Sequence, residues 1–220
     1  ALEFGVLIPP VRVRDNLQLE PNQYIIKLKG NIVAAYDLHP DMWLAMNPSK
    51  IKEMPEGIPT RDPAFGLPAI WVNDSGKEKA EILGYTVVDS ISVLSTHLQE
   101  TLKDNFDKIL TRQSVKQLLE NLKKEYNAVI EDINADALPL GTIQKVLQNL
   151  LRERIPIKDL VQILEALIDY SKVTKNVDVL SEYARHAIGD TIAGLFKDEN
   201  GVIHVAALGE SLETHIINTI

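Results

Sequence analysis

The sequence predicts an α+β protein built from several subdomains, and three observations lead to that fold class. The first third alternates apolar and polar residues with the two-residue period of half-buried strands. The second half repeats apolar residues at the spacing of amphipathic helices. The chain has 220 residues, a length that favours two or more lobes over one compact domain.

The strongest strand signal lies between Tyr24 and Ala35. Isoleucine and leucine alternate with lysine there, and Gly30-Asn31 in the middle suits a two-residue turn, so we expect an antiparallel hairpin. Residues 6–13 are also apolar, but two consecutive prolines within them cannot donate hydrogen bonds to a sheet. This stretch is therefore expected to be an edge strand or a turn into one.

From about residue 40 to residue 89, short apolar stretches alternate with connectors rich in proline. Several short strands with turn signals between them are typical of a small β-containing lobe. Because a long helix follows directly, we interpret this lobe as an insertion. Asp89 is the expected N-cap of that helix, since its side chain can accept a hydrogen bond from a free amide of the first turn.

Residues 110–196 are expected to be almost wholly helical. Three stripes of apolar residues, which begin at Val115, Ile143 and Leu160, recur with the spacing of one helix face. A fourth helix is expected over residues 177–196, weakened locally by two glycines. Residues 202–205 are expected to return to strand.

Charge and composition argue against several classes of function. The chain has 23 basic and 31 acidic residues, whereas nucleic-acid binders carry a basic excess that neutralises phosphates. It has no cysteine, and therefore no disulfide, thiolate nucleophile or cysteine-ligated zinc site. No apolar run reaches the roughly 20 residues that span a bilayer, and the first ten residues do not read as a signal peptide. These features favour a soluble intracellular protein that binds no nucleic acid.

We expect no enzyme, cofactor or metal site. The sequence contains neither phosphate-binding motif, the Walker loop or Gly-x-Gly-x-x-Gly. The five histidines are scattered without a pair four residues apart, so surface or boundary positions explain them better than metal ligation. No serine stands in a Gly-x-Ser-x-Gly turn.

The most unusual stretch surrounds Phe65, which stands between Pro63 and Pro68 and is followed by Gly66. Because proline stiffens the backbone, an aromatic ring displayed here would lose little entropy on binding a partner. Composition alone nevertheless favours the alternative that Phe65 closes the core of the small lobe.

A series of motifs follows along the chain, among them Pro9-Pro10-Val11-Arg12-Val13-Arg14-Asp15-Asn16, Leu44-Ala45-Met46-Asn47-Pro48, Asp62-Pro63-Ala64-Phe65-Gly66-Leu67, Tyr85-Thr86-Val87-Val88-Asp89 and Ile155-Pro156-Ile157-Lys158-Asp159-Leu160. In this order they resemble the cytosolic part of the FHIPEP family, the export gates of type III secretion, in its flagellar branch. No single motif is catalytic, but their order is specific, and the similarity runs without large gaps from about Phe4 to Ala207.

The resemblance implies a fragment of a larger protein of the bacterial inner membrane, exposed on the cytoplasmic side, whose N-terminal membrane half is missing. It implies a split β-rich first subdomain over residues 1–40 and 90–109 and a small inserted α/β second subdomain over 41–89. A helical third subdomain over 110–189 and the start of a truncated fourth over 190–220 would follow. The family assembles into a nonameric ring, so self-association is expected.

The resemblance also implies that flagellar export chaperones deliver their substrates to an apolar depression between the first two subdomains. Other proteins of the export apparatus would be further partners. An apolar anchor beside a carboxylate and a hydroxyl supplies affinity and orientation together. The principal contacts would be Asp62, Phe65 and Thr96, and the depression would be lined by Pro48, Leu67, Val88 and Val93.

Alternatives to this interpretation remain open. Leu67, Val88 and Val93 are equally well explained as core residues. The chain is alternatively the export gate of a virulence type III secretion system, although the motif over residues 62–67 favours the flagellar branch. It is also alternatively a mainly structural fragment that builds the ring.

Overall fold

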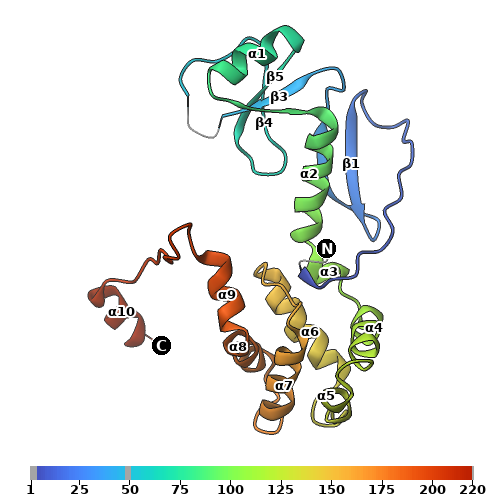
Figure 1. Ribbon diagram of the computed structural model, residues 1–220, viewed down its shortest axis with the longest axis vertical. Helices are drawn as coiled ribbons and strands as arrows, with labels where there is room; N and C mark the ends of the chain where they lie inside the picture. The colour runs from blue at the N-terminus through green and yellow to red at the C-terminus, as the bar shows by residue number, and fades with distance from the viewer. Residues whose placement is uncertain (1–3, 48–50, 220) are drawn as a thin grey trace. The chain divides into compact units, whose positions relative to one another are not determined.

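The computed structural model describes residues 4–47 and 51–219 (Figure 1). The chain divides into two compact units, of which residues 8–109 form one, and residues 110–220 together with the N-terminal end form the other. The predicted α+β class is confirmed, with both strands and helices in the first unit and helices dominating the second. The finer division into four subdomains stays a prediction.

The predicted hairpin is formed by β1 (Gln23–Leu28) and β2 (Asn31–Asp37), which pair antiparallel. The register pairs Leu28 with Asn31, so the turn consists of Lys29 and Gly30, one residue earlier than predicted. Both turn residues have positive φ, 51° and 87°, as a type I′ turn requires. Gly30 adopts this conformation without steric cost.

The predicted edge strand over residues 6–13 is not formed, since residues 6–16 contain neither helix nor strand. Pro9 and Pro10 supply no backbone N–H groups, which removes donors that a sheet would need. Val11 and Val13 are consequently exposed.

Four short strands of the insertion form one antiparallel sheet in the order β4-β5-β3-β6, as the sequence predicts for this lobe. Alternate residues of β5 point to opposite faces of the sheet. Ile70 and Val72 pack on one face, together with Ala80 of a helix, whereas Ala69 and Trp71 pack on the other. The elements are β3 (Trp43–Met46), β4 (Ile58–Arg61), β5 (Pro68–Val72), α1 (Asp74–Ile82) and β6 (Thr86–Asp89).

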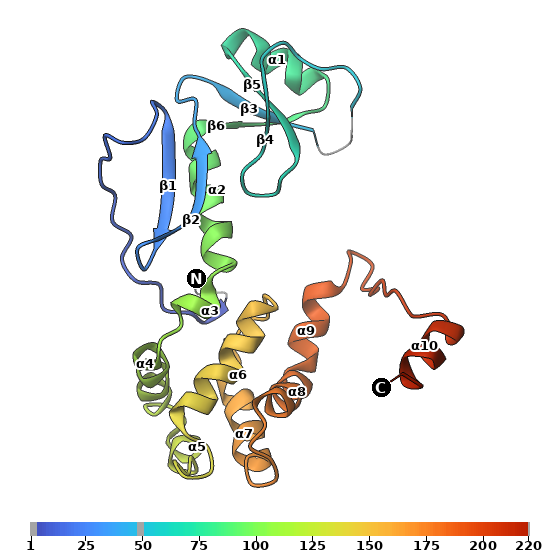
Figure 2. The ribbon, with the colours of Figure 1, turned by 180° about the vertical axis from the view of Figure 1, so that it is seen from behind.

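The helix α2 (Ser90–Lys103) begins where the sequence predicts it. The side chain of Asp89 caps it by accepting a hydrogen bond from the Ser92 N–H at 2.9 Å. Figure 2 shows α2 running alongside the β1–β2 hairpin, and Val93 inserts from α2 into the apolar cluster on one face of the four-stranded sheet. The short helix α3 (Phe106–Ile109) ends this unit.

The second unit is helical, and the three predicted stripes are confirmed as helices α4, α6 and α7. Most leucines and isoleucines of the stripes on α6 and α7 are buried and form the core together with Leu180, whereas Ile168 is half-buried. The predicted fourth helix is broken at Ile188 into α8 and α9. The helices are α4 (Arg112–Leu122), α5 (Asn127–Glu131), α6 (Leu140–Arg152), α7 (Leu160–Tyr170), α8 (Val177–Ala187), α9 (Gly189–Phe196) and α10 (Glu210–Ile217).

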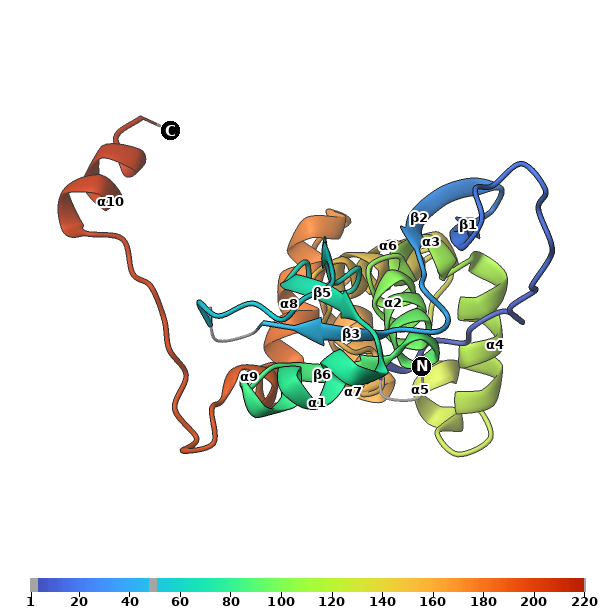
Figure 3. The same cartoon turned by 90° about the horizontal axis from the view of Figure 1, so that it is seen from above.

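The predicted strand over residues 202–205 is not formed. Ile203 makes only an isolated bridge with Lys197, and the chain then leads in an extended path to α10 (Figure 3). In the described part of the chain, every helix is too short or too polar to cross a membrane.

Candidate docking surface

The turn between β4 and β5 carries the aromatic residue of the predicted docking motif. The carboxylate of Asp62 accepts a hydrogen bond from the Phe65 backbone N–H at 2.5 Å, and the Asp62 carbonyl accepts one from Gly66 at 2.9 Å. Gly66 has φ of 68°, which a residue with a side chain rarely adopts. The turn is thereby fixed, and it leaves 59% of Phe65 exposed.

Asp62 itself is only 5% exposed, so its carboxylate lies beneath the turn rather than on its surface. Its charge acts on three buried or half-buried groups around it. Burial raises the pKa of Tyr24 and Tyr36, and the nearby charge of Asp62 raises both further. Burial lowers the pKa of His97, an effect that the charge of Asp62 opposes.

These groups form a polar cluster that we define as Tyr24, Tyr36, Asp62 and His97. The Tyr24 hydroxyl lies 2.6 Å from His97 Nδ1, and the rings of Tyr24 and Tyr36 each meet the imidazole edge to face at 5.7 and 6.3 Å. The cluster brings together residues of β1, β2, the β4–β5 turn and α2. Asp62, which holds the turn around Phe65, therefore lies close enough to His97 of α2 to influence its pKa.

Thr96 is half-buried on α2, beside the cluster residue His97. The turn and this helix face a common groove of about 530 Å³, to which the turn contributes Pro63 and Ala64 and the helix contributes His97 and Glu100. The groove therefore brings the β4–β5 turn and α2 together, although none of Asp62, Phe65 and Thr96 lines it.

The predicted lining residues have different positions. Val93 is 2% exposed and packs with Trp71, and Val88 is partly buried against the same apolar cluster. Leu67 is half-buried, and its carbonyl accepts a hydrogen bond from the Asp62 N–H. Pro48 lies outside the described residues. Val88 and Val93 thus have core contacts, and their role in docking stays a prediction.

Comparison with known proteins places the chain in a family. The model of the FHIPEP family matches residues 1–220. The chain belongs to the FHIPEP family. The resemblance predicted from the motifs is therefore confirmed.

The relatives of this FHIPEP chain include the flagellar biosynthesis protein FlhA of Bacillus subtilis. It is 45% identical over 216 residues, which is 98% of this chain and 32% of FlhA. The chain therefore spans about a third of the length of this relative.

Solved structures of similar fold include the Chlamydia pneumoniae CdsV protein, with a TM-score of 0.83 and 26% identity over 98% of this chain and 62% of CdsV. The nonameric EscV cytosolic domain of a type III secretion system has a TM-score of 0.64 and covers 89% of this chain and 58% of EscV. At 22% identity, the likeness to EscV shows the fold alone.

Sequence reasoning missed the polar cluster of this FHIPEP chain. Tyr24 and His97 are 73 residues apart, and no spacing in the sequence indicates that they meet. Across residues 4–47 and 51–219, no group of three or more histidine, aspartate or glutamate side chains is arranged to hold a metal ion.

Proposed function

We propose that this chain is a docking platform of a flagellar type III protein export gate and receives export chaperones together with their substrates. The exposed ring of Phe65 on a hydrogen-bonded turn is the observation that carries the proposal. An aromatic ring held in this way binds a partner at low entropic cost, because its backbone is already ordered. Binding hot spots are typically such anchors, surrounded by residues that exclude water.

The three principal residues contribute in different ways. Phe65 supplies the apolar contact, and Thr96 supplies a hydroxyl that can donate or accept a hydrogen bond. Asp62 acts through geometry, because its carboxylate already accepts the Phe65 N–H and is shielded from solvent. Leu67 forms the base of the turn, and Val93 supports the docking surface from the core.

The family relationship supports the flagellar assignment and an assembled form. A flagellar FlhA shares 45% identity with nearly all of this chain. The EscV cytosolic domain of similar fold is nonameric. We therefore extend the proposal to a ring of copies of this chain on the cytoplasmic side of the bacterial inner membrane, with other export-apparatus proteins as partners.

The experiment that tests docking compares Phe65→Ala with Phe196→Ala. The two rings have nearly equal exposure, 59% and 61%, but Phe196 belongs to the other unit. Binding of a purified flagellar chaperone–substrate complex is measured by calorimetry, with thermal melts of each variant. We expect Phe65→Ala to cost roughly 2 kcal/mol of binding free energy with little change in melting temperature.

Phe196→Ala is expected to bind the complex as the unchanged chain does. Unchanged binding by Phe65→Ala, or an equal loss in both variants, would contradict docking at this turn. A collapse of the melting temperature for Phe65→Ala alone would instead identify Phe65 as a structural residue.

A further inference from the structure

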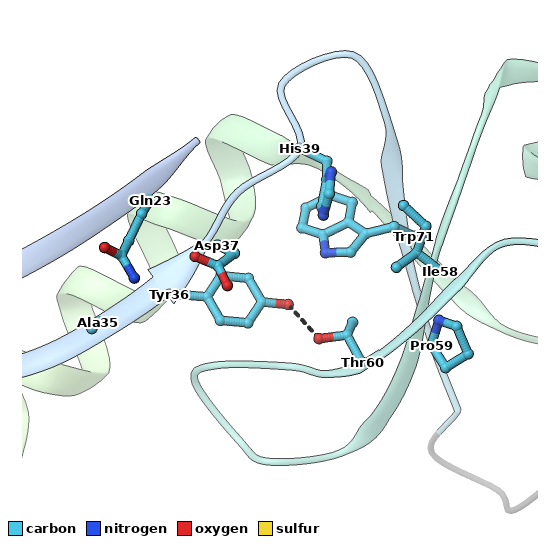
Figure 4. Close-up of a pocket in the computed structure, with 9 residues that line it drawn as sticks. All are labelled: Gln23, Ala35, Tyr36, Asp37, His39, Ile58, Pro59, Thr60 and Trp71. Atoms are coloured by element: carbon cyan, nitrogen blue, oxygen red, sulfur yellow. Dashed lines mark hydrogen bonds between the residues drawn. The ribbon is translucent and has the colours of Figure 1, made fainter. Parts of the chain in front are cut away.

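A second hollow of the first unit lies on the side of the β4 strand and contains none of the docking residues named above. Its volume is about 370 Å³ (Figure 4). One wall is the end of β2, with Tyr36 and Asp37, and the other is the edge strand β4, with Ile58. A hydrogen bond of 3.3 Å between Tyr36 Oη and Thr60 Oγ1 joins the two walls.

Aromatic rings form the inner surface of this pocket. The imidazole of His39 meets the indole of Trp71 at 5.3 Å between ring centroids, and Tyr36 lies 6.4 Å from the same indole. The faces of such rings carry partial negative charge and attract cations. Among the lining residues, all of them described, there is no lysine or arginine that would already satisfy this attraction.

Two polar side chains line the pocket with hydrogen-bonding capacity left over. Asp37 is exposed and Gln23 is half-buried. Neither the carboxylate nor the amide makes a side-chain hydrogen bond or ion pair within the described ranges. Figure 4 shows the Asp37 carboxylate beside the Tyr36 ring. The Gln23 amide lies at the same end of the pocket as Asp37, opposite Ile58 and Pro59. Oxygen acceptors and aromatic faces are therefore presented together.

We propose that this pocket binds an arginine side chain presented by a segment of a partner protein. A guanidinium group is planar, donates several hydrogen bonds and stacks on aromatic faces, so it matches the carboxylate of Asp37 and the rings of Tyr36 and His39 at once. The methylene stem of arginine would lie along the apolar surface of Ile58 and Pro59. An anionic ligand is disfavoured, because Asp37 repels it and no cation lines the pocket.

The edge strand β4, which forms one wall of the pocket, explains why the pocket would recognise a side chain rather than an added strand. β4 is an edge strand of its sheet, and edge strands otherwise attract a further strand by backbone pairing. Pro59 in the middle of β4 has no N–H to donate, which weakens such pairing. Affinity must then come from the side chain that enters the pocket. This inference does not depend on docking at Phe65.

The test uses the whole chain, labelled with ¹⁵N, and an acetylated pentapeptide amide, Gly-Ser-Arg-Ser-Gly. The matched probe replaces arginine by citrulline, which has nearly the same shape but no charge. The chain has two tryptophans, and their indole N–H signals report separately. Trp71 lines the pocket, whereas the Trp43 indole donates to Asp74 at 2.7 Å, away from the pocket, and serves as the internal reference.

We expect the arginine peptide to shift the Trp71 indole signal saturably and to leave the Trp43 signal unchanged. The citrulline peptide is expected to bind about tenfold more weakly, as is the arginine peptide to Asp37→Asn, since each change removes a charge-assisted contact. Asp41→Asn is the control, because Asp41 is exposed, lies nearby in the chain and does not line the pocket.

Equal binding of the two peptides, or equal binding to Asp37→Asn and the unchanged chain, would overturn the proposal. Tighter binding of free arginine amide than of the peptide would overturn the assignment to a protein segment. Phe65→Ala is expected to bind the arginine peptide normally. Failure of docking at Phe65 and failure of this proposal are therefore distinguishable.

Discussion

The carboxylate of Asp62 accepts a hydrogen bond from the backbone N–H of Phe65, so a buried acid holds an exposed aromatic ring in place. The acid is 5% exposed and the ring 59%, although both belong to one short turn. This relationship gives the motif a physical meaning. The aspartate shapes the turn, and the phenylalanine is what the turn displays.

Replacing Asp62 by alanine is expected to weaken both the fold and docking. The Phe65 N–H would lose its acceptor, and an intramolecular hydrogen bond of this kind contributes about 0.5–1.5 kcal/mol. Asp62→Asn keeps an acceptor oxygen and is the matched variant, expected to retain most of the stability. Urea denaturation and binding of the chaperone–substrate complex measure the two effects. If the alanine variant equals the unchanged chain in both, Asp62 does not shape the turn.

Thr96→Val tests whether the hydroxyl on α2 contributes to docking. Valine has nearly the same shape but can form no hydrogen bond, and the side chain is only half-buried, so the fold should tolerate the change. We expect binding of the complex to weaken by about 1 kcal/mol, the usual worth of one hydrogen bond. Thr96→Ser, which keeps the hydroxyl, should bind nearly normally. Equal affinities of the valine and serine variants would exclude this role.

Val93→Ala separates a core role from a surface role. Val93 is 2% exposed and packs against Trp71, so the loss of its methyl groups should cost about 2 kcal/mol of unfolding free energy. Ile91→Ala is the control on the same helix, because Ile91 is exposed and its loss should change stability by no more than about 0.5 kcal/mol. Chemical denaturation decides: similar losses in the two variants would show that Val93 is not a core residue.

The parts of the fold that could be predicted from the sequence are those determined by residues close together in the chain. The hairpin follows from alternation, and α2 begins at Asp89 because a side chain there caps it. The turn was misplaced by one residue because Lys29, a residue with a side chain, adopts positive φ. The apolar pattern did not mark α1, since Ala80 is its one buried residue. This helix is instead capped by the side chain of Asn73.

The candidate site was less accessible from the sequence. Composition favoured Phe65 as a core residue, whereas the structure exposes it, because the turn around it is closed by its own hydrogen bonds. Only the family resemblance indicated the opposite. Contacts such as that between Tyr24 and His97 depend on how distant segments pack, which periodicity and spacing do not encode.

The burial of His97 against Tyr24 predicts how the stability of the fold depends on pH. His97 has a pKa below its ordinary value of 6.5, because burial disfavours the charged ring. The unfolded chain therefore binds a proton more readily than the folded chain as the pH falls below about 6.5. Stability should be independent of this group above about pH 7.5 and decrease on acidification, by no more than about 1.4 kcal/mol per pH unit.

His97→Gln isolates this effect, because glutamine does not titrate and can still hydrogen bond with Tyr24. Its unfolding free energy is measured at pH 7.5 and pH 5.5 and compared with that of the unchanged chain. The variant is expected to start from a lower stability, since its packing differs, but to lose less on acidification. The change in unfolding free energy between pH 7.5 and pH 5.5 is therefore the informative quantity, because the changed packing lowers the stability at both pH values alike. Equal changes would mean that another group causes the acid sensitivity, and the neutral, buried state of His97 would then have to be abandoned.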